Sequence, residues 1–236
     1  MNGLLIRVGA DLSPGGGSWN GPVHAGSGEF VYVAIPENSM MHAGMEKPYR
    51  ALTPMLAKFG VRLPEHLQVR HMHLDPDFEH LTYGDQGERA KQLRANLRGG
   101  DLIVFYAGLA DTSGAAQLVY ALIGFFVVED FVLATEVPRA QRDMNAHSRR
   151  VLLPGATDLI VRGRCAVSGR FTRCVPIGEY RDRAYRVRKD VLKEWGGLSV
   201  KDGYLQRSAR LPRLLDPPRF MQWLERQRPS LMQANN

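Results

Sequence analysis

The sequence predicts an α/β or α+β fold: a mixed central sheet flanked by helices, with a basic C-terminal extension packed on it. Strand-like segments rich in β-branched, aromatic and leucine residues recur along the chain, and helix-like segments lie between them. Hydrophobic residues make up 44% of the 236 positions and charged residues 23%. These values are typical of a folded protein and exclude an acidic disordered tail, a collagen-like rod and a long coiled coil.

The first strand is expected at 3–8, where GLLIRV is a short apolar run, and the glycine-rich stretch 9–28 after it is expected to be irregular. Further strands are expected at 29–35, 67–74 and 101–108, and helices at 48–59 and 86–97. Pro48 favours the start of a helix, and Gly99 and Gly100 favour the end of one.

A long β-prone run at 117–135 is predicted to bend near Gly124 or Glu129. Strands are then expected at 157–162 and 171–177, and helices at 187–195 and 217–227. Because no internal repeat and no clear linker interrupts the chain, we expect residues 1–236 to form a single domain.

Charge divides this expected domain into two unlike halves. Residues 1–138 carry 10 Lys or Arg and 15 Asp or Glu, whereas residues 139–236 carry 21 and 9. We therefore expect an acidic half that bears the site and an arginine-rich half packed on it. A basic half of this kind is typical of nucleic-acid binders. The alternative is that a GC-rich genome raises arginine use and the surface is simply solvated.

The expected compartment is the cytoplasm, with no membrane contact. The longest apolar run, 118–128, is too short to span a bilayer, and the N-terminus lacks a signal-peptide layout. Cys165 and Cys174 do not form a disulfide framework.

The segment HMHLDPDFEHLTYGD at 71–85 is the densest in chemically active side chains. On a strand, His71, His73 and Asp75 would point to the same face. Three interpretations are open. The first is a metal site, since His and Asp bind Zn²⁺ and Fe²⁺. The second is metal-free acid–base chemistry. The third is that the acidic side chains fix a turn beside Pro76. The absence of a standard ligand spacing favours the second interpretation over the first.

The loop 9–22 presents Asp11 at the end of a strand, followed by Trp19 and Asn20. An aromatic side chain on such a loop suits stacking on an extruded base, and an amide can read a base edge. The alternative is an ordinary surface loop.

One histidine and four arginines near residues 150 and 170 are candidate contacts to DNA phosphates. The alternative is that they lie on solvated loops. The set is His147, Arg149, Arg150, Arg170 and Arg173. No fingerprint for a nicotinamide, flavin, methyl donor, NTP or zinc-deaminase site is present, so no cofactor and no resident metal is expected.

Four blocks together resemble the nucleotide-modification-associated domain family, third type. They are IRVGADLSPGG, HLDPDFEHLTYGD, GDLIVFYAGL and NAHSRR with LIVRGRCAVSGR, and they extend from the first predicted strand to residue 170. The resemblance implies an association with phage and bacterial systems that hypermodify DNA bases or defend against such DNA. The third block is also similar to PUA-like and EVE-type barrels that bind modified bases.

The leading hypothesis is a DNA glycosylase-like hydrolase that acts on modified bases in DNA. The sequence favours an enzyme but leaves a non-enzymatic protein open. The catalytic candidates are Asp75, Asp77, Asp11, His73 and His80, and the base-binding candidates are Trp19, Asn20, Tyr83, Asp85 and Tyr106. The alternatives are a non-enzymatic reader of modified DNA and a metal-dependent enzyme that modifies bases at the nucleotide level. The expected partner is DNA with modified bases; protein partners are not predicted.

Overall fold

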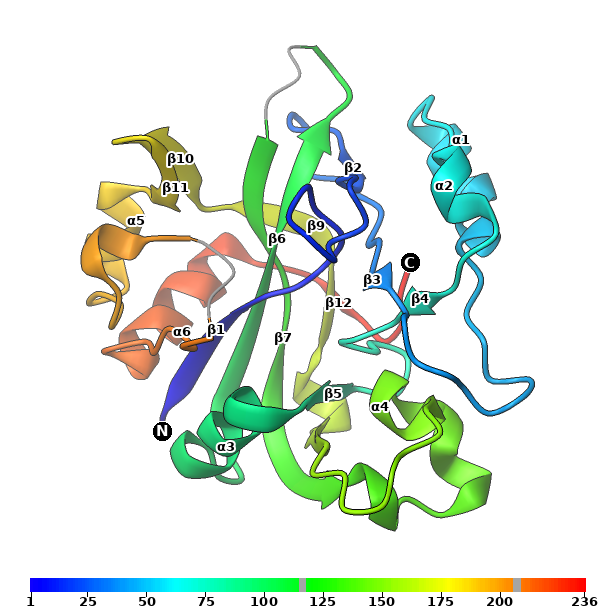
Figure 1. Cartoon of the computed structure of the whole chain (residues 1–236). Helices are drawn as coiled ribbons and strands as arrows, with labels where there is room; N and C mark the ends of the chain where they lie inside the picture. Colours follow the sequence, from blue (N-terminus) through cyan, green and yellow to red (C-terminus); the bar gives the residue numbers. More distant parts are fainter. Residues whose placement is uncertain (115–117, 206–208) are drawn as a thin grey trace.

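The computed structural model describes residues 1–114, 118–205 and 209–236 (Figure 1). Its centre is an eight-stranded mixed sheet, which confirms the predicted mixed α/β architecture. The main path of the sheet runs β1-β6-β7-β8-β5, while β2 pairs with β6, and β9 pairs with β7 and β12. Its strands are β1 (Gly3–Arg7), β2 (Pro22–Val23), β5 (Thr82–Asp85), β6 (Leu102–Asp111), β7 (Leu118–Leu133), β8 (Leu159–Gly163), β9 (Gly169–Pro176) and β12 (Leu231–Met232).

Two small ribbons accompany the sheet. They are β3 (Ile35–Pro36) with β4 (Met72–His73), and β10 (Gly178–Arg181) with β11 (Ala184–Val187). The α-helices are α1 (Thr53–Lys58), α2 (Glu65–Gln68), α3 (Gly87–Asn96), α4 (Ala146–Arg149), α5 (Lys189–Glu194) and α6 (Pro217–Gln227). The 3-10 helices are η1 (Tyr49–Leu52), η2 (Ala134–Glu136), η3 (Arg139–Met144), η4 (Cys165–Val167) and η5 (Lys201–Gly203). Within the described ranges, no helix has the length and hydrophobicity to cross a membrane.

The sheet separates two hydrophobic cores, because successive side chains of β6 point to opposite faces. Ile103 and Phe105 join the core that lies under the N-terminal loop, α1 and α3. Val104 joins the core that α5 and α6 cover, where the Trp195 ring lies 4.9 Å from Phe220 and 5.2 Å from Trp223. Figure 1 shows α1 and α2 on one side of the sheet and α5 and α6 on the other.

The pairing of β7 is irregular near both of the alternative positions predicted for its bend, Gly124 and Glu129. Its register shifts between Leu122 and Gly124 against β9, and between Val128 and Asp130 against β8. A Cβ at Gly124 would lie 2.5 Å from the Gly169 carbonyl oxygen, so only glycine lets β9 approach here. The predicted run begins at residue 117, which lies outside the described residues.

Two predicted strands are shorter than expected. Residues 31–34 are buried, yet they form no strand: the Val31 amide donates to Pro22 of β2 (3.1 Å), and Val33 accepts from Ala10 in the loop after β1 (2.7 Å). The alternating pattern therefore correctly predicted that these side chains are buried, but these residues do not form the predicted strand. In 67–74, the residues after Pro64 first complete the helix α2, and only Met72–His73 pairs as a strand.

Gly124→Ala is predicted to lower the free energy of unfolding by about 1–3 kcal/mol, because the new methyl group meets rigid backbone. Urea denaturation followed by circular dichroism measures this. Gly26→Ala is the control, since no atom lies within 4 Å of its Cβ position. Equal stability of both variants would contradict the close approach of β9.

Candidate functional site

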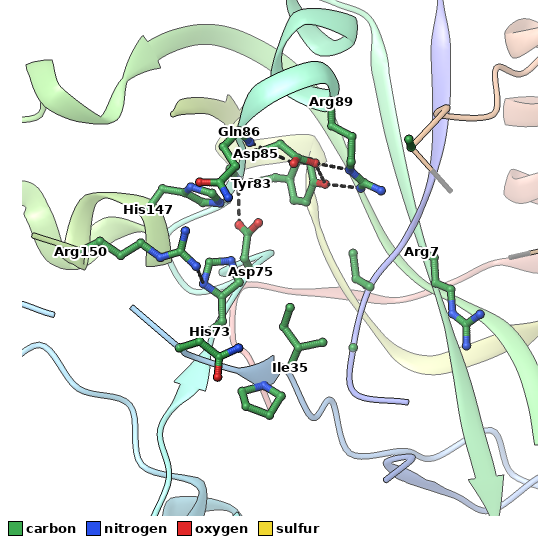
Figure 2. Close-up of a pocket in the computed structure, with 16 residues that line it drawn as sticks. Arg7, Ile35, His73, Asp75, Tyr83, Asp85, Gln86, Arg89, His147 and Arg150 are labelled. Carbon is green, nitrogen blue, oxygen red and sulfur yellow. Dashed lines mark hydrogen bonds and ion pairs between the residues drawn. The ribbon is translucent and has the colours of Figure 1, made fainter. Parts of the chain in front are cut away.

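A pocket of about 460 Å³ lies beside the ends of β1, β4 and β5, and α3 and α4 complete its walls (Figure 2). Polar side chains from five separate stretches of the chain meet in it. The residues that line it are Arg7, Val8, Gly9, Ile35, Pro36, Asn38, His73, Asp75, Tyr83, Gly84, Asp85, Gln86, Arg89, His147, Arg150 and Ala209.

His73, Asp75 and His147 converge at one end of this pocket, as Figure 2 shows. One ligand atom from each lies within 4.8 Å of the other two. The two imidazole rings pack edge to face, with their centres 5.0 Å apart. Both histidines are buried, whereas Asp75 is half-buried.

Two carboxylates fix the orientation of the histidines. His73 Nδ1 lies 2.7 Å from Glu37 Oε2, and His147 Nδ1 lies 2.6 Å from Asp158 Oδ1. At His147 this contact favours the tautomer whose Nε2 carries the free lone pair. His73 Nδ1 also lies 3.1 Å from Arg150 Nη2, and the shorter contact with Glu37 favours the same tautomer there. No hydrogen bond to either Nε2 atom occurs among the described residues. Both Nε2 atoms are thus left for a ligand.

Asp75 is oriented in the same way through one of its oxygens. Its Oδ1 accepts hydrogen bonds from the Gly84 amide (2.8 Å) and Asn145 Nδ2 (2.9 Å). No described residue donates to Oδ2. Asn145 also caps α4, because its side chain accepts from the His147 amide at 2.9 Å. A single amide therefore positions both Asp75 and His147.

Arg150 balances the charge of the two supporting carboxylates. Its guanidinium lies 3.0 Å from Glu37 and 3.9 Å from Asp158. Burial alone would raise the pKa of Glu37, but hydrogen bonds with His73 and Arg150 hold it well below its usual value. Burial lowers the pKa of His73 to about 4 and raises that of Asp75 to about 7.

The opposite wall is built by a second ionic group. Asp85 Oδ2 accepts from the Tyr83 hydroxyl (2.7 Å) and from Arg89 Nε (2.6 Å), and Arg89 Nη2 donates to the Tyr83 hydroxyl (2.9 Å). Arg7 pairs with Asp11 at 3.1 Å. The arginines that line the pocket are engaged with protein carboxylates, so they give it shape more than net charge.

Two imidazoles and one carboxylate with open positions form a donor set for a divalent metal ion. Zn²⁺ takes such sets in hydrolytic sites, and Fe²⁺ takes them in non-haem sites. Carboxylates hydrogen-bonded to the metal-binding histidines are the usual support of such centres, and Glu37 and Asp158 stand in that place.

Six of the residues proposed from the sequence line the pocket: His73, Asp75, Tyr83, Asp85, His147 and Arg150. His147, proposed there as a phosphate contact, lies with His73 and Asp75. His71 is not among the lining residues, although it was expected to share their face; the strand β4 is only two residues long.

Asp77 and Arg149 form a buried ion pair beneath the site, each side chain about 1% exposed. Asp77 also pairs with His80 at 3.2 Å and accepts from Asn235 at 3.1 Å. Burial would raise the pKa of Asp77, but the hydrogen bond with His80 and the charge of Arg149 keep it below its usual value. These three proposed residues contact one another and do not line the pocket, and Arg149 is buried.

The glycine loop holds its proposed residues away from the pocket. Asp11 accepts from the amide and hydroxyl of Ser13, and Asn20 donates to the Gly108 carbonyl at 2.8 Å. Trp19 packs against the first core. These contacts explain why the loop is ordered despite its glycines.

Three further proposed residues also lie elsewhere. Tyr106 is buried in the second core. Arg170 is 5% exposed and lies 4.9 Å over the Phe30 ring. Arg173 lines a separate groove near the C-terminal segment.

Sequence reasoning missed Glu37, Asn145, Asp158 and Arg89. Asn145 carried a detectable signal, because Asn before a short helix is a favoured N-cap. Glu37 and Asp158 carried none, since their importance comes only from histidines distant in the sequence.

A family model described as nucleotide modification associated domain 3 matches residues 2–218, and the chain belongs to this family. A search of curated proteins and a search of solved structures found no match.

Asp77→Asn is predicted to destabilise the protein by about 3–5 kcal/mol, because it leaves the Arg149 charge buried without its partner. Urea unfolding measures this. Asp130→Asn is the matched control: it breaks an exposed pair with Arg162 and should cost at most about 1 kcal/mol. Unchanged stability with lost activity in Asp77→Asn would instead place Asp77 in the chemistry.

Proposed function

We propose that the protein is a metal-dependent enzyme that modifies a nucleobase, with DNA carrying modified bases as its substrate. The observation that carries this proposal is the convergence of His73, Asp75 and His147, with the two histidines held by carboxylates at Nδ1 and Asp75 held by two donors at Oδ1.

The metal would be held by the two Nε2 atoms and by Asp75 Oδ2. A divalent ion in such a site lowers the pKa of a bound water to about 7, which supplies hydroxide at neutral pH. The reaction class that follows is hydrolysis: the water oxygen bonds to an electrophilic carbon of the base or its substituent, and the leaving nitrogen or oxygen takes the proton.

The remaining walls suit a flat heterocycle. A volume of about 460 Å³ lies in the range of small-molecule sites. The planar Arg89 guanidinium offers a face for stacking, and the exposed Gln86 amide offers a donor and an acceptor for a base edge.

The family supports the nucleotide part of this proposal through its description. We further propose the setting of phage or bacterial DNA modification, or of defence against modified DNA.

A second candidate is hydrolysis of the N-glycosidic bond without a metal. The observation that favours it is the open Oδ2 of Asp75, which lines the pocket and could activate water or stabilise an oxocarbenium-like sugar. A reader without activity is the third outcome of the tests below.

Wild-type protein is predicted to bind one divalent ion per chain, and His73→Ala and His147→Ala are each predicted to lower its affinity at least about tenfold. Chelator-treated protein would be titrated with Zn²⁺, Mn²⁺ and anaerobic Fe²⁺ by calorimetry, with metal content measured by mass spectrometry. His71→Ala is the control, since His71 does not line the pocket. Binding lost equally in His71→Ala, or absent from wild type, contradicts the metal site.

Metal-loaded protein is predicted to convert a modified nucleoside in phage DNA into a new nucleoside. A panel of unmodified and modified phage DNAs, digested and analysed by mass spectrometry, measures this. Free base with abasic sites would support the glycosylase instead, and retention of modified DNA without product would support the reader.

A further inference from the structure

A second hollow lies next to the pocket. It measures about 890 Å³ and is lined by α3, by Arg186 of β11, and by residues within 199–204 and 209–213. Ala209 lines both the pocket and this groove, so a single stretch of chain separates them.

That dividing stretch is fastened to α3. Gln92 Nε2 donates to the Ala209 carbonyl at 2.7 Å, and Gln92 Oε1 accepts from the Leu211 amide at 3.0 Å. The same helix carries Arg89 into the pocket, and Glu88, Gln92 and Asn96 into the groove. The relative positions of pocket and groove are therefore set by one helix.

The groove is strongly basic. Its lining includes Arg186, Lys201, Arg210 and Arg213 against one acid, Glu88. Lys201 and Arg213 are exposed, and neither forms an ion pair with any residue in the part of the chain that the structure describes. Arg186 lies 5.3 Å over the Tyr204 ring, and its Nε is buried without a hydrogen-bond partner among the described residues.

The pocket itself has less positive charge available to a phosphate than the groove. Arg89 and Arg150 are paired there with Asp85 and Glu37. A nucleotide that placed its base near His73 and Asp75 would have to put its phosphates elsewhere. Lys201 and Arg213, which form no ion pair among the described residues, line the adjoining groove.

We propose that this groove binds the phosphodiester backbone of the DNA strand whose base enters the pocket. The inference rests on the proposed function and specifies its substrate as a polynucleotide rather than a free nucleotide. Backbone contacts of this kind position the strand without reading its sequence.

The test is the double variant Lys201→Gln/Arg213→Gln, measured by fluorescence anisotropy with a labelled single-stranded DNA 12-mer of ordinary bases. We expect at least a tenfold loss of affinity. We also expect the slope of log K against log salt to fall by about 1.4, since each phosphate contact on a single strand contributes about 0.7. Metal content should stay at one ion per chain, which also shows that the variant is folded.

Arg50→Gln/Arg62→Gln is the matched control. It removes two exposed arginines that do not line the groove, one just before α1 and one just after it; Figure 1 shows α1 well apart from α3 and β11. The groove proposal is overturned if the groove variant binds the 12-mer with wild-type affinity, or if the control variant loses as much affinity as the groove variant.

Two outcomes distinguish failure of the groove proposal from failure of the metal-site proposal. Metal-loaded wild type that binds dCMP but not the 12-mer overturns the groove and leaves the metal site intact. Groove-dependent binding of the 12-mer by protein that takes up no metal supports the groove and removes the proposed chemistry.

Discussion

The contacts between two carboxylates and the Nδ1 atoms of two histidines govern the rest of the site. Glu37 and Asp158 each contact the Nδ1 atom of a histidine that lines the pocket. Arg150 lies against both acids and offsets their charge. Without these contacts the rings of His73 and His147 would be free to rotate, and their nitrogens would no longer meet beside Asp75.

A buried polar layer beneath the pocket supports this arrangement. The Asp77–Arg149 pair lies directly behind the segment that carries Asp75, and Asn145 connects that segment to α4. The C-terminal end of the chain completes the layer, because Asn235 donates to Asp77 and accepts from the Phe78 amide. Residues that share one sequence segment are thus divided between the lining of the pocket and the buried layer.

Local pattern in the sequence predicted much of the fold, including the positions where the pairing of β7 is irregular, because strand periodicity and glycine placement are local properties. It also located His73 and Asp75. It could not separate Asp75 from Asp77, or Arg150 from Arg149, because neighbouring residues of one type differ only in the direction that packing gives them. His147 was predicted as a phosphate contact because its partner Asp158 and its neighbour His73 meet it only through the tertiary fold.

The central claim is that one metal ion lies between His73, Asp75 and His147. Crystals of metal-loaded protein, measured on both sides of the absorption edge of the bound element, test it most directly. The account predicts one anomalous peak per chain in the pocket, about 2.0–2.2 Å from both Nε2 atoms and from Asp75 Oδ2. A pocket without a peak, or a peak bound by other residues, would contradict it.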